Sequence, residues 1–245
     1  RHKTINKYVS AKFKLVKNQS KKDFAILNTK NFYIKRELES KNFLSKVIKI
    51  EKNTNNIFLK KINNQYFNTD GNKENLKFIL EVAKILKLKR NSLVKTLKKF
   101  KGLKYRQEKI FQSKKLTIIN DSKATTFSSS VSLIKSLNNI YWIVGGQAKK
   151  GDKLLLSKKN CKNIKAYIFG TNKNFFISKI KKLMKYESFL DLKSLVKKLS
   201  LEIKVDKNIT HKTILFSPSA ASFDNFKNFE KRGEYFNQLI KKYIN

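Results

Sequence analysis

The chain has 245 residues, of which 40% are hydrophobic, and 57 Lys and Arg residues against 17 Asp and Glu residues give it a formal net charge of +40. This length and apolar content suit one large or two modest domains. The single cysteine, Cys161, excludes an internal disulfide and a cysteine-based zinc cluster, and lysines interrupt every long apolar run, so we predict no membrane span.

The net charge has two interpretations. A polyanion-binding protein would use Lys and Arg to neutralise phosphates. However, the lysines are spread evenly along the chain, and seven Gly, one Pro and one Trp accompany them, a mix that is typical of AT-rich codon usage. We therefore favour a solvated basic surface that needs no partner. Residues 1–15 contain no apolar leader segment, so the expected location is the cytoplasm.

The first hundred residues predict a mixture of helices and short strands. Apolar residues recur at the helical period from residue 3 to 17. Four short runs follow, "FAILN", "FYIKRE", "KVIKIE" and "NIFLKKI", and each predicts a strand or a half-buried sheet edge. A helix is then expected at "NTDGNKENLKFILEVAKILKL", capped by Asp70 or Asn72, with a second helix around "SLVKTLKKF".

From "LTII" onward the chain alternates between apolar strands and helices. Strands are expected at "LTII", "IYWIVGG", "KAYIFG" and "TILFS", and helices at "SSSVSLIKSL", "FFISKIKKL", "LKSLVKKLS" and the C-terminal "NFEKRGEYFNQLIKKYI". This rhythm predicts an α/β fold with a mainly parallel sheet. The change of rhythm predicts two domains, residues 1–101 and 102–245.

Polar segments follow three of the predicted strands: "NDSKAT", "GGQAKKGD" and "SPSAASFD". Ligands of open α/β sheets bind at the carboxyl ends of strands, where helix N-termini attract anions. Two lysines and three hydroxyl residues would add charge and donors, namely Lys123, Lys149, Thr125, Ser217 and Ser222. Together these features predict a pocket for a small carboxylate or phosphate. The alternative is that these residues only cap helices and turns.

Asp121 is expected to be an acceptor in this pocket, suited to a hydroxyl, an amine or a metal-bound water. The sequence contains no Walker-type phosphate loop, G-x-S-x-G elbow or H-E-x-x-H motif. His2 and His211 are far apart along the chain and lack the spacing of a metal site. We interpret both histidines as structural or surface residues.

Four segments, "FKGLKYR", "INDSKAT", "WIVGGQAKKGD" and "LFSPSAASFDNFKNFEKRGEYF", occur in an order and spacing that resemble the Mur ligases. The resemblance implies that residues 1–101 are the later part of that family's central ATP-binding domain. It also implies that residues 102–245 are its Rossmann-like, glutamate-binding C-terminal domain. The last segment is similar to members that add D-glutamate to UDP-N-acetylmuramoyl-L-alanine in peptidoglycan precursor synthesis. The family's first domain and P-loop have no counterpart in these residues.

The resemblance also implies roles for individual residues. The positions that hold D-glutamate correspond to Lys123, Thr125, Lys149, Ser222 and Phe229, the last through its backbone N–H. The positions near ATP correspond to Asn72, Asn75, Arg106 and Asp121. Lys12 matches a lysine that is carbamylated and helps to hold Mg²⁺, and Lys123 and Arg106 match catalytic cations. Gly71, Tyr105 and Thr126 depart from the family pattern.

By this resemblance, the expected reaction is ATP-dependent amide formation through an acyl phosphate, with ATP and Mg²⁺ as cofactors. The expected partners are UDP-N-acetylmuramoyl-L-alanine, D-glutamate and ATP, without nucleic acid, and the expected state is a monomer. The 245 residues by themselves are expected to be inactive. Two alternatives remain open: another Mur-type or folylpolyglutamate-type ligase, and a basic nucleic-acid-binding module.

Overall fold

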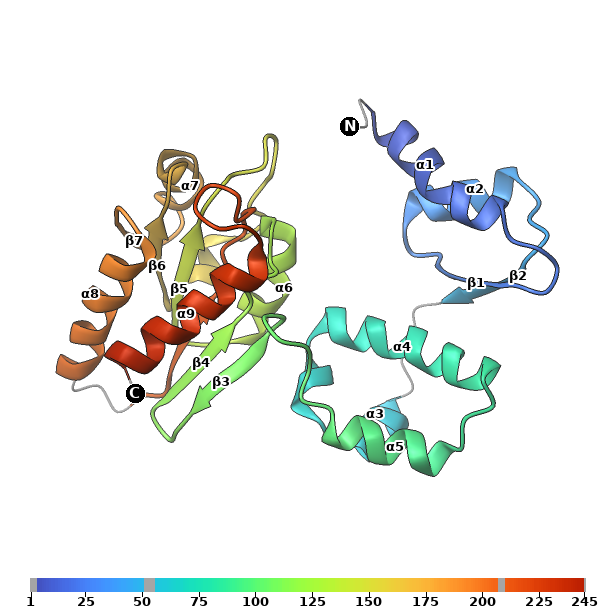
Figure 1. Cartoon of the computed structure of the whole chain (residues 1–245), viewed down its shortest axis with the longest axis horizontal. Helices are drawn as coiled ribbons and strands as arrows, with labels where there is room; N and C mark the ends of the chain where they lie inside the picture. The colour runs from blue at the N-terminus through green and yellow to red at the C-terminus, as the bar shows by residue number, and fades with distance from the viewer. Residues whose placement is uncertain (1–3, 51–55, 207–209, 245) are drawn as a thin grey trace. The chain divides into compact units, whose positions relative to one another are not determined.

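The computed structural model describes residues 4–50, 56–206 and 210–244. The chain divides into two compact units, Arg1–Phe100 and Lys101–Asn245 (Figure 1). Within the described ranges, no helix has the length and apolar character needed to cross a membrane.

The first unit combines a parallel strand pair with helices. Its elements are, in chain order, α1 (Ile5–Lys17), β1 (Phe24–Asn28), α2 (Phe32–Ser40), β2 (Lys46–Ile50), α3 (Asn56–Ile62), a 3₁₀ helix (Gln65–Asn68), α4 (Asp70–Ile85) and α5 (Arg90–Lys99). β1 and β2 are parallel, with Phe24 opposite Lys46. The helix predicted at residues 3–17 is α1, which begins at Ile5, after the N-cap Thr4. Residue 3 lies outside the described residues.

Two of the four short runs predicted as strands or sheet edges are helices. "FYIKRE" lies in α2, because the side chain of Asn31 accepts hydrogen bonds from the backbone N–H groups of Tyr33 (3.0 Å) and Ile34 (3.3 Å). These bonds start a helix directly after β1. "NIFLKKI" lies in α3, where Phe58 and Ile62 are buried four residues apart, which is the spacing of one helix face.

The N-cap of α4 also differs from the prediction. Thr69, and not Asp70 or Asn72, is the cap, and its hydroxyl accepts a hydrogen bond from the backbone N–H of Asn72 at 3.3 Å. Asn72 lies within the first turn instead, where its side-chain amide donates to the carbonyl of Tyr66 at 2.7 Å. Its side chain is therefore engaged inside its own unit.

The second unit is an α/β domain. Its elements are, in chain order, β3 (Glu108–Gln112), β4 (Leu116–Asn120), α6 (Phe127–Ser136), β5 (Ile140–Gly145), a 3₁₀ helix (Lys158–Cys161), β6 (Ile164–Phe169), α7 (Lys173–Ile180), β7 (Lys185–Ser188), α8 (Leu192–Val205), β8 (Lys212–Phe216) and α9 (Phe229–Tyr243). The strand order is β3-β4-β8-β5-β6-β7, and every pair except β3–β4 is parallel. The prediction of an α/β fold with a mainly parallel sheet is confirmed.

Helices cover both faces of this sheet. Side chains of α6 and α7 pack with Trp142 and Ile168 on one face, and those of α8 and α9 pack with Ile143 and Tyr167 on the other. Neighbouring residues of one strand thus point to opposite cores, as strand geometry requires. Because both faces are buried, the central strands read in the sequence as continuous apolar runs.

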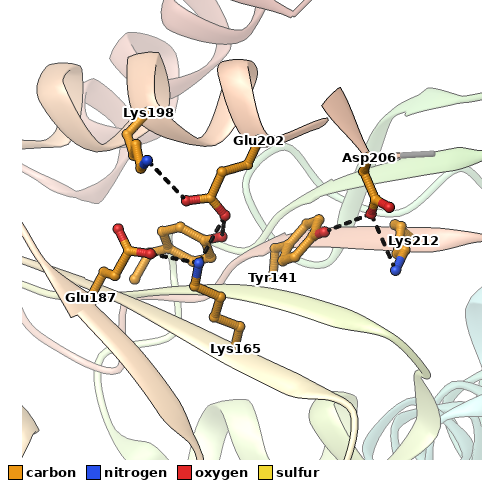
Figure 2. Close-up of polar contacts among 8 residues, drawn as sticks. Tyr141, Lys165, Glu187, Lys198, Glu202, Asp206 and Lys212 are labelled. Atoms are coloured by element: carbon orange, nitrogen blue, oxygen red, sulfur yellow. Dashed lines mark hydrogen bonds and ion pairs between the residues drawn. The ribbon is translucent and has the colours of Figure 1, made fainter. Parts of the chain in front are cut away.

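A polar cluster, shown in Figure 2, joins α8 and its C-terminal end to strands β5, β6 and β8. Lys165 of β6 forms an ion pair with Glu202 of α8 at 2.8 Å. Asp206 accepts a hydrogen bond from the hydroxyl of Tyr141 at 3.1 Å and pairs with Lys212 at 3.3 Å. These side chains are partly exposed, so each pair contributes modestly to stability. We interpret the cluster as structural.

Candidate functional site

The three polar segments singled out in the sequence meet at one edge of the sheet. "NDSKAT" leaves the end of β4, "SPSAASFD" leaves β8, and "GGQAKKGD" begins at the last residue of β5. β4, β8 and β5 are neighbouring parallel strands, so their carboxyl ends lie side by side. This is the edge at which open α/β sheets bind ligands.

Asp121 directly follows β4 at this edge and is buried. One carboxylate oxygen accepts a hydrogen bond from the hydroxyl of Ser217 at 2.8 Å, and the other accepts one from the backbone N–H of Gln107 at 3.1 Å. Burial raises the pKa of Asp121 from 3.8 to about 7, although the two hydrogen bonds and Arg106 act in the opposite direction. The predicted pure acceptor therefore carries a proton in part of its population near neutral pH.

This raised pKa predicts a pH-dependent stability. Between about pH 4 and pH 7 the folded chain holds the Asp121 proton more tightly than the unfolded chain does. The contribution of Asp121 to the free energy of unfolding therefore falls as the pH rises through this window, by on the order of 1 kcal/mol per pH unit. Asp121→Asn removes this titration, so urea unfolding across the window is expected to show a flatter pH profile for the variant. Equal slopes for both proteins would contradict the assignment.

Ser217 belongs to the internal structure and not to a ligand surface. It is fully buried, and its hydroxyl contacts the hydroxyl of Ser130 at 2.7 Å besides Asp121. Ser130 also contacts Ser219 at 2.7 Å, and the indole N–H of Trp142 donates to the carbonyl of Ser217 at 2.9 Å. The expectation that Ser217 lends a free donor to the pocket is therefore wrong, because its hydroxyl is occupied by internal partners.

Arg232 of α9 is a central residue of this edge that sequence reasoning missed. Its fully buried guanidinium donates to the carbonyls of Ser122 (2.7 Å), Ala220 (2.9 Å) and Ala221 (3.1 Å), and to the hydroxyl of Ser122 (3.1 Å). Burial lowers the pKa of Arg232 to about 10, so it stays charged at neutral pH. One side chain thereby joins the segment after β4 to the segment after β8.

A signal for this burial was present in the sequence. Arg232 lies four residues before Phe236 and eight before Ile240, and both of these apolar residues are buried in the core. Residues at this spacing share one helix face. A basic residue on the apolar face of an amphipathic helix is a candidate for a buried, functionally placed cation.

The candidate glutamate residues occupy the same edge with different exposures. Ser222 is buried, Lys123, Thr125 and Phe229 are half-buried, and Lys149 is exposed. The ammonium of Lys123 lies 4.0 Å from the centre of the Phe229 ring, a cation–π contact that draws it toward the first turn of α9. Backbone N–H groups in that first turn have no partner within the helix.

The turn that precedes β3 supports the Lys123 segment. Tyr105, which departs from the family pattern, has a positive φ of 61°, and its carbonyl accepts a hydrogen bond from the backbone N–H of Lys123 at 3.0 Å. Its ring lies against Gly233, where an added Cβ would approach within 2.4 Å of the ring. Arg106 follows in the same turn and is exposed.

The remaining candidates lie in the first unit. Lys12 is exposed on α1, with its ammonium 5.6 Å from the centre of the Tyr8 ring. Asn75 is exposed on α4, whereas Asn72 is buried.

His211 of the second unit contacts the hydroxyl of Thr117 at 3.0 Å and the carbonyl of Lys114 at 3.1 Å, as expected for a structural residue. His2 lies outside the described residues.

A divalent metal such as Mg²⁺ binds to oxygen ligands, among them the carboxylates of Asp and Glu. Across residues 4–50, 56–206 and 210–244, no three or more His, Cys, Asp or Glu side chains gather in a way that would hold a metal ion. The buried carboxyl of Asp121 is engaged by Ser217 and Gln107.

Curated relatives match nearly the whole chain. The UDP-N-acetylmuramoylalanine–D-glutamate ligase of Rickettsia felis is 32% identical over an alignment of 262 residues, which covers 99% of this chain and 58% of that protein. The ligase of the same name from Rickettsia bellii is 32% identical and covers 98% and 57%. That of the Wolbachia of Brugia malayi is 37% identical over 71% of this chain and 35% of that protein. The chain thus spans somewhat more than half the length of the relatives it matches throughout.

A solved structure supports the fold. The crystal structure of UDP-N-acetylmuramate-alanine ligase from Thermotoga maritima matches 98% of this chain and 56% of that chain, with a TM-score of 0.58 and 13% identity. No family model matches the chain.

Proposed function

Because this chain is a homologue of part of the UDP-N-acetylmuramoylalanine–D-glutamate ligases, and is thus a partial Mur ligase, we propose that it carries the glutamate-binding part of such an enzyme. The complete enzyme would join D-glutamate to UDP-N-acetylmuramoyl-L-alanine in peptidoglycan precursor synthesis, with ATP as the energy source. The observation that supports this best is the common sheet edge shared by the segments of Lys123, Ser222 and Lys149.

In this proposal, the two carboxylates of D-glutamate bind to the mixed set of cations and neutral donors at this edge. Lys149 and the first turn of α9, including the N–H of Phe229, would compensate the negative charge of the amino acid. Thr125 and Ser222 would donate hydrogen bonds that fix its orientation. The amine would then face the carbonyl that it attacks, which is the positioning that amide formation requires.

Lys123 and Arg106 are the proposed catalytic cations. The alanyl carboxylate would accept the γ-phosphoryl group to form an acyl phosphate, and the glutamate amine would displace phosphate through a tetrahedral intermediate. Negative charge spreads over oxygens in both steps, and preorganised cations stabilise it. Lys123 is suited to this role because its ammonium is held at the ring of Phe229.

The first unit would supply part of the ATP site. We propose residues 1–101 as the later part of the central ATP-binding domain and residues 102–245 as the Rossmann-like C-terminal domain. Asn75 and Arg106 are exposed and would contact ATP directly, whereas Asn72 and Asp121 are buried and would contact it only by exchanging their present hydrogen bonds. Bound Mg²⁺ would neutralise phosphate charge, and a carbamylated Lys12 would help to hold it. The proposed enzyme is a cytoplasmic monomer.

Replacing Lys123 with alanine tests the catalytic role. In the full reading frame that encodes this chain, D-glutamate-dependent phosphate release with UDP-N-acetylmuramoyl-L-alanine and ATP is expected to fall about 10²- to 10³-fold, the usual cost of removing one preorganised charge-stabilising group. Lys135→Ala removes an exposed lysine near the end of α6 and is the matched control, with no expected loss.

The acceptor is tested with the same protein. Phosphate release that requires another amino acid in place of D-glutamate would favour a related ligase of the same fold. No release with any amino acid, together with tight and steeply salt-dependent binding to random DNA, would overturn the ligase proposal in favour of nucleic-acid binding.

A further inference from the structure

The loop that carries Lys149 is attached to the domain at its near end. Gln147 exchanges two backbone hydrogen bonds of 3.0 Å with Ala221, the residue before Ser222. The next backbone N–H, that of Ala148, donates to the side chain of Asn172 at 2.9 Å. These contacts fix the start of the loop, and Lys149 itself is exposed directly after them.

The far end of the loop is attached to α6 by Asp152. One carboxylate oxygen of Asp152 accepts a hydrogen bond from the backbone N–H of Phe127, the first residue of α6, at 2.7 Å. The other oxygen accepts one from the backbone N–H of Lys153 at 3.1 Å. The backbone N–H of Asp152 donates to the carbonyl of Lys149 at 3.1 Å, so Lys149 and Asp152 lie in one tight turn.

The N-terminus of α6 lacks a cap from its own N-cap residue. Thr126 occupies the N-cap position but makes no side-chain capping bond. Its hydroxyl instead contacts the hydroxyls of Ser128 (2.9 Å) and Ser129 (2.8 Å). Asp152, 25 residues away from Phe127 in sequence, therefore supplies the carboxylate that a helix N-terminus attracts.

We infer that Asp152 is a positioning residue that sets Lys149 at a fixed place relative to Thr125. Thr125 lies two residues before Phe127, so the bond from Asp152 couples the loop of one proposed glutamate-binding residue to the segment of another. This inference rests on the proposed function. Asp152 would act through the backbone and would not touch the substrate.

Three variants of this chain test the inference by D-glutamate titration and amide hydrogen exchange. Asp152→Ala removes the acceptor oxygens, Asp152→Asn keeps one, and Asp191→Ala is a matched control. Asp191 caps α8 with the same kind of bond, a carboxylate 2.7 Å from the backbone N–H of Ser194. α8 follows β7, which lies two strands away from β5 in the sheet.

Asp152→Ala is expected to weaken D-glutamate binding about five- to tenfold. This is the change in dissociation constant that corresponds to the free energy of one lost capping bond. Exchange at Phe127 and at residues 147–151 is expected to rise in the same variant. Asp152→Asn should recover most of both properties, and Asp191→Ala should leave affinity unchanged while loosening the start of α8. If Asp152 were only a structural cap, Asp152→Ala and Asp191→Ala would lower stability equally, and neither variant would lose D-glutamate affinity.

Unchanged D-glutamate affinity in Asp152→Ala would overturn the inference, whether or not loop exchange changes. If the wild-type chain binds no D-glutamate, the proposed function fails and the positioning role fails with it. That result is distinct from a failure of the inference alone, in which the wild-type chain binds D-glutamate and the alanine variant binds it equally well.

Discussion

Replacing Arg232 with methionine is expected to lower the free energy of unfolding by about 3 kcal/mol, because four acceptors lose a hydrogen bond to this buried side chain. Methionine has a similar length but no donor, so the carbonyls of Ser122 and Ala220 remain buried and unpaired, whereas the carbonyl of Ala221 keeps its bond from the backbone N–H of Gln147. Methionine carries no charge, so the variant does not bear the free-energy cost of burying one, and this offsets part of the loss. Urea unfolding followed by circular dichroism measures the difference.

Two further variants separate the effect of the positive charge on stability from that of the hydrogen-bond geometry. Arg232→Lys keeps a positive charge but offers a point charge in place of the planar fork, so it should recover only part of the stability. Lys231→Met removes the neighbouring exposed lysine, which pairs with Glu234 at the surface, and no measurable change is expected. An Arg232→Met variant as stable as the wild type would show that the two loops hold together without the guanidinium.

The architecture of the second unit could be predicted because burial on both faces leaves a strong pattern. "IYWIVGG" and "KAYIFG" are continuous apolar runs for this reason, and they form β5 and β6. β3 and β7 could not be recognised in the same way. Both are edge strands with exposed or half-buried residues, so neither "EKIFQ" nor "KYES" carries an apolar run.

The site could be predicted only in outline. The placement of the polar segments at the carboxyl ends of strands followed from the alternation of strands and helices, but which side chains face inward depends on partners remote in sequence. Ser217 looked like a ligand donor and is instead engaged by Asp121 and Ser130. Asp121 looked ionised, but its burial raises its pKa. Such effects arise from tertiary packing and leave no local pattern.

Gly145→Ala is expected to be about as damaging as the loss of Arg232, for a purely steric reason. Gly145 ends β5 with a φ of +141°, and an added Cβ would lie 2.0 Å from the carbonyl oxygen of Phe169 on the neighbouring strand β6. The contact cannot be relieved by a side-chain rotation, because the obstacle is backbone. Overpacking and a strained φ together predict a loss of roughly 3–5 kcal/mol in the free energy of unfolding.

Gly151→Ala separates the two causes of that loss. Gly151 also has a positive φ, of 79°, but an added Cβ would meet no atom within 4 Å. This variant should therefore show only the conformational cost, about 1 kcal/mol. The further loss in the free energy of unfolding of Gly145→Ala, measured with urea, is then the cost of the clash.

The backbone N–H of Gly145 also donates to the carbonyl of Pro218 at 2.9 Å. A shift of Gly145 that relieved the clash would therefore also displace the start of the Lys149 loop from the segment that carries Ser222, so stability and D-glutamate affinity should fall together. Equal losses for both glycine variants would contradict the steric argument.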